Sequence, residues 1–235
     1  KFLLITNTVI FVLNYLGYLF NFAFLFRPFS LIPAEAVGGL QIWRVFTYLF
    51  LHDPSGFGHI LLNMLSLYMF GKTLEETWGT DRFLRFYFSC GIGAGLCVIV
   101  AGYLTGTQNI PTIGASGAIF GLLLAFGMLY PDATVMFSFL FPIKAKYMVM
   151  IIGGITFLSS LGPNTGVSNI AHLGGMLVGF FLVRQMRGQV IRRRNGPSLL
   201  RRVEDWYRDF KIQRARKKFQ VYMNKQNRKG GPYVN

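Results

Sequence analysis

Long apolar stretches without a charged side chain dominate the first four fifths of the sequence. The first of them, residues 2–26, contains no Asp, Glu, Lys, Arg or His. A helix needs about 20 such residues to cross the hydrocarbon core of a bilayer. Stretches of similar character recur up to residue 186. The sequence therefore predicts a polytopic membrane protein.

We predict an all-α fold with six transmembrane helices, forming a bundle at residues 2–26, 57–77, 83–105, 115–130, 146–162 and 168–186. Within the first span, Asn7, Asn14 and Asn21 recur at heptad spacing, so this polar stripe is expected to face protein rather than lipid. The span is too long for a signal peptide and has no small-residue cleavage site. The chain begins at Lys1 and not at Met, which is consistent with further residues before it.

The positive charge is concentrated in a tail that follows the apolar region. Although 52% of the residues are hydrophobic, the formal net charge is +15, of which residues 1–186 contribute +3 and residues 187–235 contribute +12. We therefore divide the chain into a membrane domain, 1–186, and a basic cytoplasmic tail, 187–235. An apolar stripe on the tail predicts an amphipathic helix that binds anionic lipids; it consists of Leu199, Val203, Trp206 and Phe210. No motif supports binding to nucleic acid.

The charges between the spans predict the orientation. The second and fourth connections carry Lys72, Arg82, Arg85, Lys144 and Lys146, whereas the third and fifth are uncharged. The positive-inside rule then places both termini in the cytoplasm. We expect a multi-pass protein of a cell membrane, with a bacterial inner membrane favoured.

Four polar residues lie at the outer ends of three predicted spans. His59 and Asn63 begin span two, Ser116 begins span four and His172 begins span six. Polar and ionisable residues within a membrane are costly and indicate function by default. These four are expected at one depth, close to the outer surface.

Their chemistry favours nucleophilic catalysis. A serine hydroxyl becomes a nucleophile when a neighbouring base accepts its proton, and His172 is the natural base for Ser116. The helix that begins at Ser116 offers unpaired backbone amides to an oxyanion, and His59 and Asn63 can add side-chain donors.

Each of these residues also has a structural interpretation. Ser116 lies in IGASGAIFG, and Gly175 and Gly179 form a GxxxG motif, so both segments could serve only to pack helices closely. Asn63 could bridge two helices, and a lone histidine could belong to the core or to a proton path.

Cys90 and Cys97 are expected to be packing residues. No cofactor is expected, and no metal site, because three dispersed histidines lack paired carboxylates or cysteines. A transporter is disfavoured since neither midplane charges nor internal repeats occur.

Four motifs together resemble the rhomboid family of intramembrane serine proteases. They are GASG at 114–117, AHLGGMLVG at 171–179, WR at 43–44 and HILLNM at 59–64. The resemblance covers roughly residues 1–186.

The resemblance implies a dyad without an acidic third member, in which Ser116 is the nucleophile and His172 the general base. It implies that the oxyanion is held by the Ser116 amide, His59 and Asn63. Supporting roles fall to Gly114, which keeps the approach open, and Phe120, which stacks on the histidine. It also implies structural roles for Trp43 and Arg44 in the first loop and for Glu75 before Gly79, and it places a polar residue, Asn169, before His172.

One spacing departs from the family pattern. The family separates its two span-two histidines by a shorter interval, whereas His52 and His59 are seven positions apart and enclose DPSGFG. We interpret His52 as a loop-packing residue.

The substrates that the resemblance implies are single-span membrane proteins with helix-weakening residues near the outer end of their segment. We expect span five and the fifth loop to gate access to the site. The alternative is a non-catalytic rhomboid-like protein that binds transmembrane segments for quality control.

Overall fold

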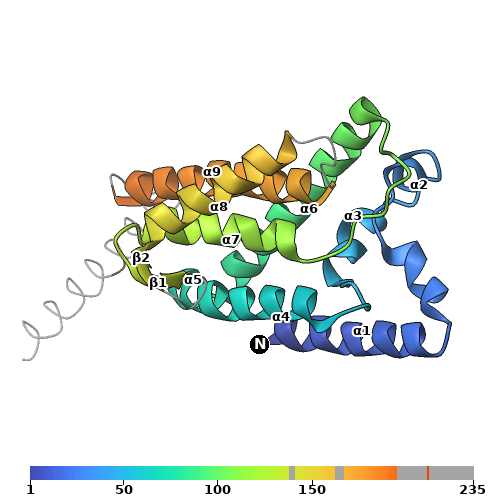
Figure 1. The fold of residues 1–235 in the computed structure, drawn as a ribbon. Coiled ribbons are helices and arrows are strands. Elements are labelled where there is room, and N and C mark those ends of the chain that lie inside the picture. The colour runs from blue at the N-terminus through green and yellow to red at the C-terminus, as the bar shows by residue number, and fades with distance from the viewer. Residues whose placement is uncertain (138–140, 162–166, 195–210, 212–235) are drawn as a thin grey trace, which may run out of the picture. The chain divides into compact units, whose positions relative to one another are not determined.

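The chain is mainly helical (Figure 1). The structure is a computed structural model that describes residues 1–137, 141–161, 167–194 and 211. Its elements, in chain order, are α1 (Phe2–Leu19), the 3-10 helix η1 (Ala23–Phe29), α2 (Pro33–Val37), α3 (Arg44–Thr47), the 3-10 helix η2 (Tyr48–Phe50), α4 (Phe57–Ser66), the π-helical turn η3 (Leu67–Gly71), α5 (Lys72–Trp78), α6 (Thr80–Thr105), α7 (Ser116–Leu129), β1 (Thr134–Phe137), β2 (Phe141–Lys144), α8 (Ala145–Ser160) and α9 (Val167–Arg194).

Contacts divide the chain into two units, Lys1–Arg184 and Gln185–Asn235. The first unit contains all of the candidate site. Of the second unit, residues 185–194 continue α9. The apolar stripe predicted for the basic tail, Leu199 to Phe210, lies outside the described residues.

Each of the six predicted apolar segments contains helix in its described part, but the first helix is shorter than predicted. Instead of reaching residue 26, α1 ends at Leu19, because Asn21 adopts a left-handed conformation with φ 59°. Asparagine tolerates this conformation better than most residues. Asn7 and Asn14 are buried, as the polar stripe predicted, whereas Asn21 is exposed beyond the end of the helix. The stripe is therefore confirmed for two of its three members.

A short hairpin corrects the prediction of an all-α chain. Strands β1 and β2 pair antiparallel, with Thr134 opposite Lys144. Asp132 accepts hydrogen bonds from Lys144 and Lys146, at 3.2 and 2.9 Å, at the base of the hairpin. β-Branched and aromatic residues favour such a strand pair, but the run is too short to stand out between two apolar helices.

Helix α7 occupies the middle of the bundle, where Figure 1 shows it between α4 and α9. It packs against α6, α8 and the π-helical turn. Its glycines let α9 approach: an added Cβ at Gly179 would lie 3.1 Å from Gly121 Cα. The predicted packing role of the GxxxG motif is thus confirmed.

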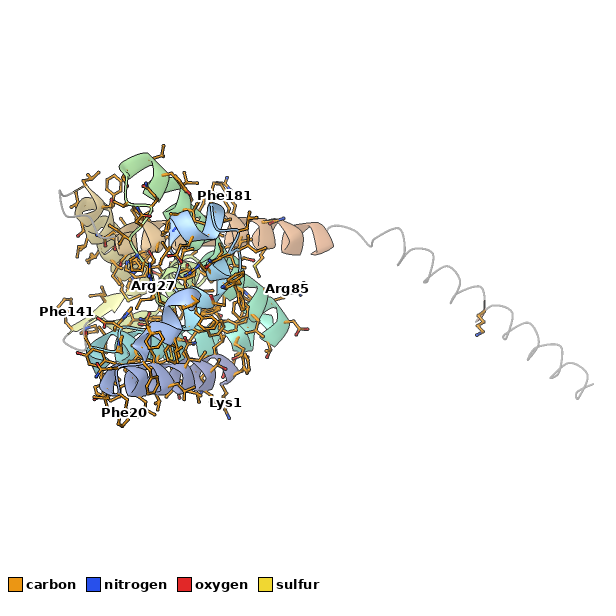
Figure 2. All side chains as sticks on the ribbon, turned by 90° about the vertical axis from the view of Figure 1, so that its right-hand side faces the viewer. Lys1, Phe20, Arg27, Arg85, Phe141 and Phe181 are labelled. Atoms are coloured by element: carbon orange, nitrogen blue, oxygen red, sulfur yellow. The ribbon has the colours of Figure 1, made fainter. Side chains whose placement is uncertain are left out.

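The surface of the first unit is rich in large apolar side chains. Figure 2 shows Phe20 and Phe141 at the edge of the body, where they are 68% and 48% exposed. Within the described residues, α1 and α6 are long and apolar enough to cross a membrane, and α7 and α8 are shorter apolar helices. Soluble monomers rarely expose apolar patches of this extent, so the surface fits a lipid environment.

The segment between α1 and α4 is organised around Arg44, which is only 2% exposed. Its guanidinium group contacts the carboxylate of Glu35 and donates to the carbonyls of Arg27 and Ser30, at 2.8 and 2.6 Å. Trp43 donates from Nε1 to the carbonyl of Pro28. These contacts fold the segment on itself, in line with a structural role for the WR pair.

Candidate active site

Ser116 and His172 are brought together by α7 and α9. The distance between Ser116 Oγ and His172 Nε2 is 2.8 Å, which is a hydrogen bond. Ser116 is the first residue of α7, where backbone amides have no partner within the helix. Both side chains are half-buried. A hydroxyl that donates to Nε2 is positioned to lose its proton to that nitrogen.

The ring of His172 lies flat on the ring of Phe120. Their centroids are 4.0 Å apart and their planes differ by 4°. Phe120 is on α7, one turn after Ser116, so a single helix supplies both the hydroxyl and the surface on which the imidazole rests. This contact limits rotation of the imidazole and holds Nε2 toward the serine.

Gly114 leaves a space beside the serine that a side chain on residue 114 would fill. Its φ is +119°, a conformation that residues with a side chain rarely adopt. An added Cβ would lie 3.0 Å from His59 Nε2 and 3.8 Å from Ser116 Oγ. A methyl group on residue 114 would thus contact both the hydroxyl and the imidazole of His59.

His59 and Asn63 occupy one face of α4. The Nδ2 atom of Asn63 donates to the carbonyl of His59 at 2.8 Å, and Asn63 is buried. An amide nitrogen has two hydrogens, so this bond leaves one for another acceptor. His59 thus lies beside the space at Gly114, with Asn63 one turn further along the same helix.

The loop before α4 contributes contacts that the sequence analysis missed. The backbone N–H of Asp53 donates to His59 Nδ1 at 3.3 Å, and Asp53 Oδ1 accepts from the Ser55 amide at 2.9 Å. The Ser55 amide and hydroxyl hold the pKa of the Asp53 carboxyl below its usual value. The Asp-Pro-Ser sequence is a turn signal that could have indicated this loop.

His52 packs in this loop, as interpreted from the sequence. It is fully buried, and its ring meets that of His59 edge to face with the centroids 5.1 Å apart. Burial, with a smaller contribution from His59, lowers the pKa of His52 to about 4. Neither ring nitrogen of His52 has a hydrogen-bond partner among the residues that the structure describes.

The sequence did not indicate the contacts that Tyr48 makes near the site. Its carbonyl accepts from the amide of Gly114 at 3.0 Å, and its hydroxyl donates to the carbonyl of Gly91 on α6 at 2.7 Å. Leu31 and Thr112 add a two-way backbone bridge. The segment before Ser116 is therefore tied to the first loop and to α6, which fixes the conformation of Gly114.

Other residues named from the sequence lie away from this cluster. Glu75 accepts from the Thr80 hydroxyl at 2.9 Å, and Asn169 is half-buried on α9. Over the described ranges, no group of His, Cys, Asp and Glu could hold a metal ion.

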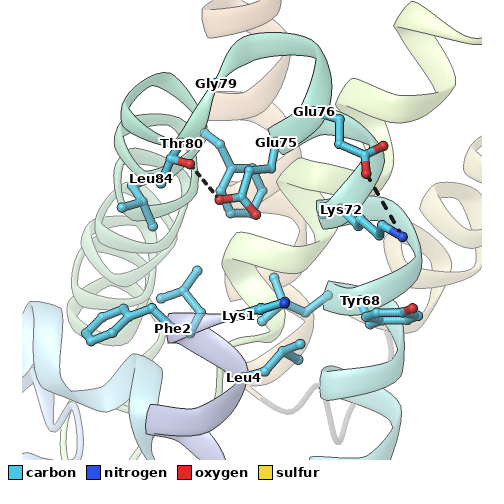
Figure 3. A pocket seen from close by; sticks show the side chains of 14 residues that line it. Lys1, Phe2, Leu4, Tyr68, Lys72, Glu75, Glu76, Gly79, Thr80 and Leu84 are labelled. Atoms are coloured by element: carbon cyan, nitrogen blue, oxygen red, sulfur yellow. Dashed lines mark hydrogen bonds and ion pairs between the residues drawn. The ribbon is translucent and has the colours of Figure 1, made fainter.

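A pocket of about 480 Å³ lies apart from the serine, between the start of α1, the helices α5 and η3, and the start of α6 (Figure 3). Glu75 and Thr80 are bonded across it, and Lys72 pairs with Glu76 at 4.0 Å. None of the four polar residues identified from the sequence lines this pocket.

The chain is similar to a family of known proteins. Residues 39–188 match the model of the Rhomboid domain. The chain is 28% identical over 189 residues to RHOMBOID-like protein 12, mitochondrial, of Arabidopsis thaliana, covering 75% of this chain and 54% of that protein. Two proteins of Bacillus subtilis are also similar. The rhomboid protease GluP is 34% identical over 59% of this chain and 25% of its own length. The putative rhomboid protease YdcA is 35% identical over 60% of this chain and 65% of its own length. The chain thus spans less than two thirds of each of these relatives.

Proposed function

Because the chain belongs to the rhomboid family, we propose that it is an intramembrane serine endopeptidase with Ser116 as nucleophile and His172 as general base. The observation that carries the proposal is the 2.8 Å contact between Ser116 Oγ and His172 Nε2, with the imidazole stacked on Phe120. Two similar bacterial proteins bear the name rhomboid protease, which agrees with this activity.

In the first step, Ser116 Oγ attacks the carbonyl carbon of a peptide bond while His172 Nε2 takes the hydroxyl proton. The carbonyl oxygen becomes an oxyanion. It is stabilised by the Ser116 amide, by His59 Nε2–H and by the second hydrogen of Asn63 Nδ2. Because Gly114 has no side chain to fill the space between Ser116 and His59, this oxygen can approach both of them.

In the second step, the C–N bond breaks, and protonated His172 gives its proton to the leaving amine. The acyl group remains on Ser116 as an ester. A water molecule then attacks the ester carbonyl as His172 accepts its proton, and that proton passes to Ser116 Oγ when the acyl product leaves. Catalysis thus returns both residues to their starting states.

The proposed substrate is a transmembrane segment, cleaved in or near the bilayer. The proposed arrangement is six spans with both termini in the cytoplasm, which puts Ser116, His59 and His172 near the outer surface. A substrate helix must unwind there, because a peptide bond in a regular helix is not open to attack; small or helix-breaking residues lower that cost.

Access to the site is proposed to be gated by α8 and the connection after it. The predicted fifth loop includes residues 162–166, which lie outside the described residues. A disulfide engineered between α8 and α4 should abolish cleavage of a membrane substrate and restore it on reduction. Unchanged cleavage in the oxidised protein would contradict the gate.

The basic segment 187–235 is proposed to bind anionic lipid. The protein should be reconstituted in bilayers of neutral lipid alone and of neutral plus anionic lipid, with Trp43 and Trp78 replaced by Phe so that Trp206 is the remaining tryptophan. Brominated lipids should quench Trp206 more strongly in the anionic bilayer. Equal quenching in both would remove the lipid-binding role.

The activity is tested with a fluorophosphonate probe and a fluorescent single-span substrate in detergent. Ser116→Ala and His172→Ala should each lower cleavage by about 10³-fold or more and abolish labelling. Ser160→Ala is the matched control, because Ser160 is on α8 and its hydroxyl donates to the carbonyl of Phe157 on the same helix. A folded parent that neither labels nor cleaves would instead favour binding of transmembrane segments without hydrolysis.

A further inference from the structure

One peptide group lies between α1 and the imidazole of His59. Asn14 Nδ2, on α1, donates to the carbonyl of His52 at 3.1 Å. The N–H of the same peptide group belongs to Asp53 and donates to His59 Nδ1 at 3.3 Å. Both polar atoms of this peptide are therefore bonded, one to each helix. Hydrogen bonds thus connect Asn14 to His59 through this peptide group.

This contact selects a tautomer of His59. A neutral imidazole has one N–H and one acceptor nitrogen, and the nitrogen that accepts cannot hold the proton. Because the Asp53 amide donates to Nδ1, the proton lies on Nε2. Nε2 lies 3.0 Å from the position of a Cβ added to Gly114, and Cε1 lies 3.1 Å from it. The edge of the ring that carries the donor nitrogen thus borders that space.

Two further contacts hold the peptide in place. Asp53 Oδ1 accepts from the Ser55 amide, which closes a turn just after the peptide. The buried ring of His52 packs against His59 and limits its rotation. Asn14 is itself only 5% exposed, so its amide is held by its surroundings.

We propose that Asn14 is a positioning residue that acts through the His52–Asp53 peptide group to keep His59 in the Nε2–H form, ready to donate to the oxyanion. We call this connection, from Asn14 through the His52–Asp53 peptide group to His59, the relay. Its function rests on the proposed protease activity. The seven-residue interval between His52 and His59 then has a role, because it brings the Asp53 amide over Nδ1.

A matched pair of variants on α1 tests the relay. Asn7 is also a buried asparagine of α1, but its Nδ2 donates to the carbonyl of Leu3 within the same helix. Asn14→Leu and Asn7→Leu therefore remove similar buried amides, and only the first breaks the relay. Asp53→Pro removes the N–H itself, whereas Asp53→Ala keeps it.

The direct readout is the 15N spectrum of the protein labelled at its histidine rings. The chain has three histidines, so the signals of His59 are assigned by their loss in His59→Gln. In the parent we expect an unprotonated Nδ1 and a protonated Nε2 on His59. Asn14→Leu and Asp53→Pro should move these signals toward a mixture of tautomers, and Asn7→Leu should leave them unchanged.

The kinetic readout separates positioning from binding. Loss of one ordinary hydrogen bond corresponds to about a fivefold change in a rate or equilibrium constant. In Asn14→Leu, kcat should therefore fall about fivefold while KM stays the same. Asn7→Leu should keep the parent kcat even if its thermal stability falls equally.

A protonated Nδ1 on His59 in the parent would overturn the relay. So would identical His59 signals and kcat in Asn14→Leu and Asn7→Leu. If His59 shows the Nε2–H form and depends on Asn14, but the parent does not react with the fluorophosphonate, the positioning stands and the proposed protease activity fails.

Discussion

Gly175 on α9 lies so close to Gly117 on α7 that a Cβ added to Gly175 would be 1.8 Å from the carbonyl oxygen of Gly117. Gly117 follows Ser116 directly, and Gly175 is one turn after His172. The contact between these two glycines therefore sets the distance between the serine and the histidine. Any side chain at this crossing must push α7 and α9 apart.

Gly175→Ala should accordingly abolish cleavage and lower the free energy of unfolding by about 3 kcal/mol, since the new methyl group meets backbone that cannot move aside. Activity and thermal denaturation in detergent measure both effects. Gly154→Ala is the control: Gly154 is on α8, and an added Cβ there has no neighbour within 4 Å. That variant should keep activity and gain up to about 1 kcal/mol from helix propensity. Full activity in Gly175→Ala would contradict the role of the crossing.

Gly114→Ala should lower the cleavage rate by about 100-fold or more, because its methyl group would occupy the space shared by Ser116 and His59. Gly106→Ala separates this effect from backbone strain. Gly106 also has positive φ, 73°, but an added Cβ there meets nothing within 4 Å. Gly106→Ala should cost about 1 kcal/mol of stability and leave the cleavage rate unchanged. Equal loss of activity in both variants would show that strain, and not the filled space, is responsible.

Phe120→Leu should lower kcat about tenfold with little change in KM, because the imidazole of His172 loses the ring on which it is stacked. Phe181→Leu provides the comparison, since Phe181 is on the same helix as His172 and is 61% exposed. Cleavage rates at several substrate concentrations resolve kcat from KM. A Phe120→Leu enzyme with the parent kcat would exclude the ring as a positioning surface.

The buried His52 makes stability depend on pH. Its pKa is lowered to about 4, so the unfolded chain binds a proton more readily than the folded protein once the pH falls below about 6.5. The contribution of His52 to the free energy of unfolding is thus fully present above that pH and is lost as the pH falls toward 4. Between pH 7.5 and pH 5 the loss is about 2 kcal/mol.

His52→Leu removes this ionisation while keeping an apolar side chain against His59. The drop in thermal midpoint between pH 7.5 and pH 5 should therefore be smaller in His52→Leu than in the parent. Other histidines also titrate, so part of the drop remains. An equal drop in both proteins would mean that His52 does not charge on unfolding in this range.

Much of the helical layout and of the site follows from local patterns. Uncharged apolar stretches indicate helices wherever they are long enough, and each of the six predicted segments contains helix in its described part. The polar residues at the ends of three stretches stand out because apolar surroundings make them costly. The end of α1 at Asn21 and the β1–β2 hairpin were not anticipated, because a single backbone conformation and a short strand pair leave weak signals.

The sequence by itself determined which residues could do chemistry: Ser116, His172, His59 and Asn63 are conspicuous in spacing and surroundings without any coordinates. Only the tertiary structure decided how they meet. The 2.8 Å distance between Ser116 and His172 depends on the crossing of α7 with α9. The peptide group that contacts His59 is held by Asn14, 45 positions earlier in the chain than His59. Contacts between distant segments arise from packing of whole helices, and local periodicity does not contain that information.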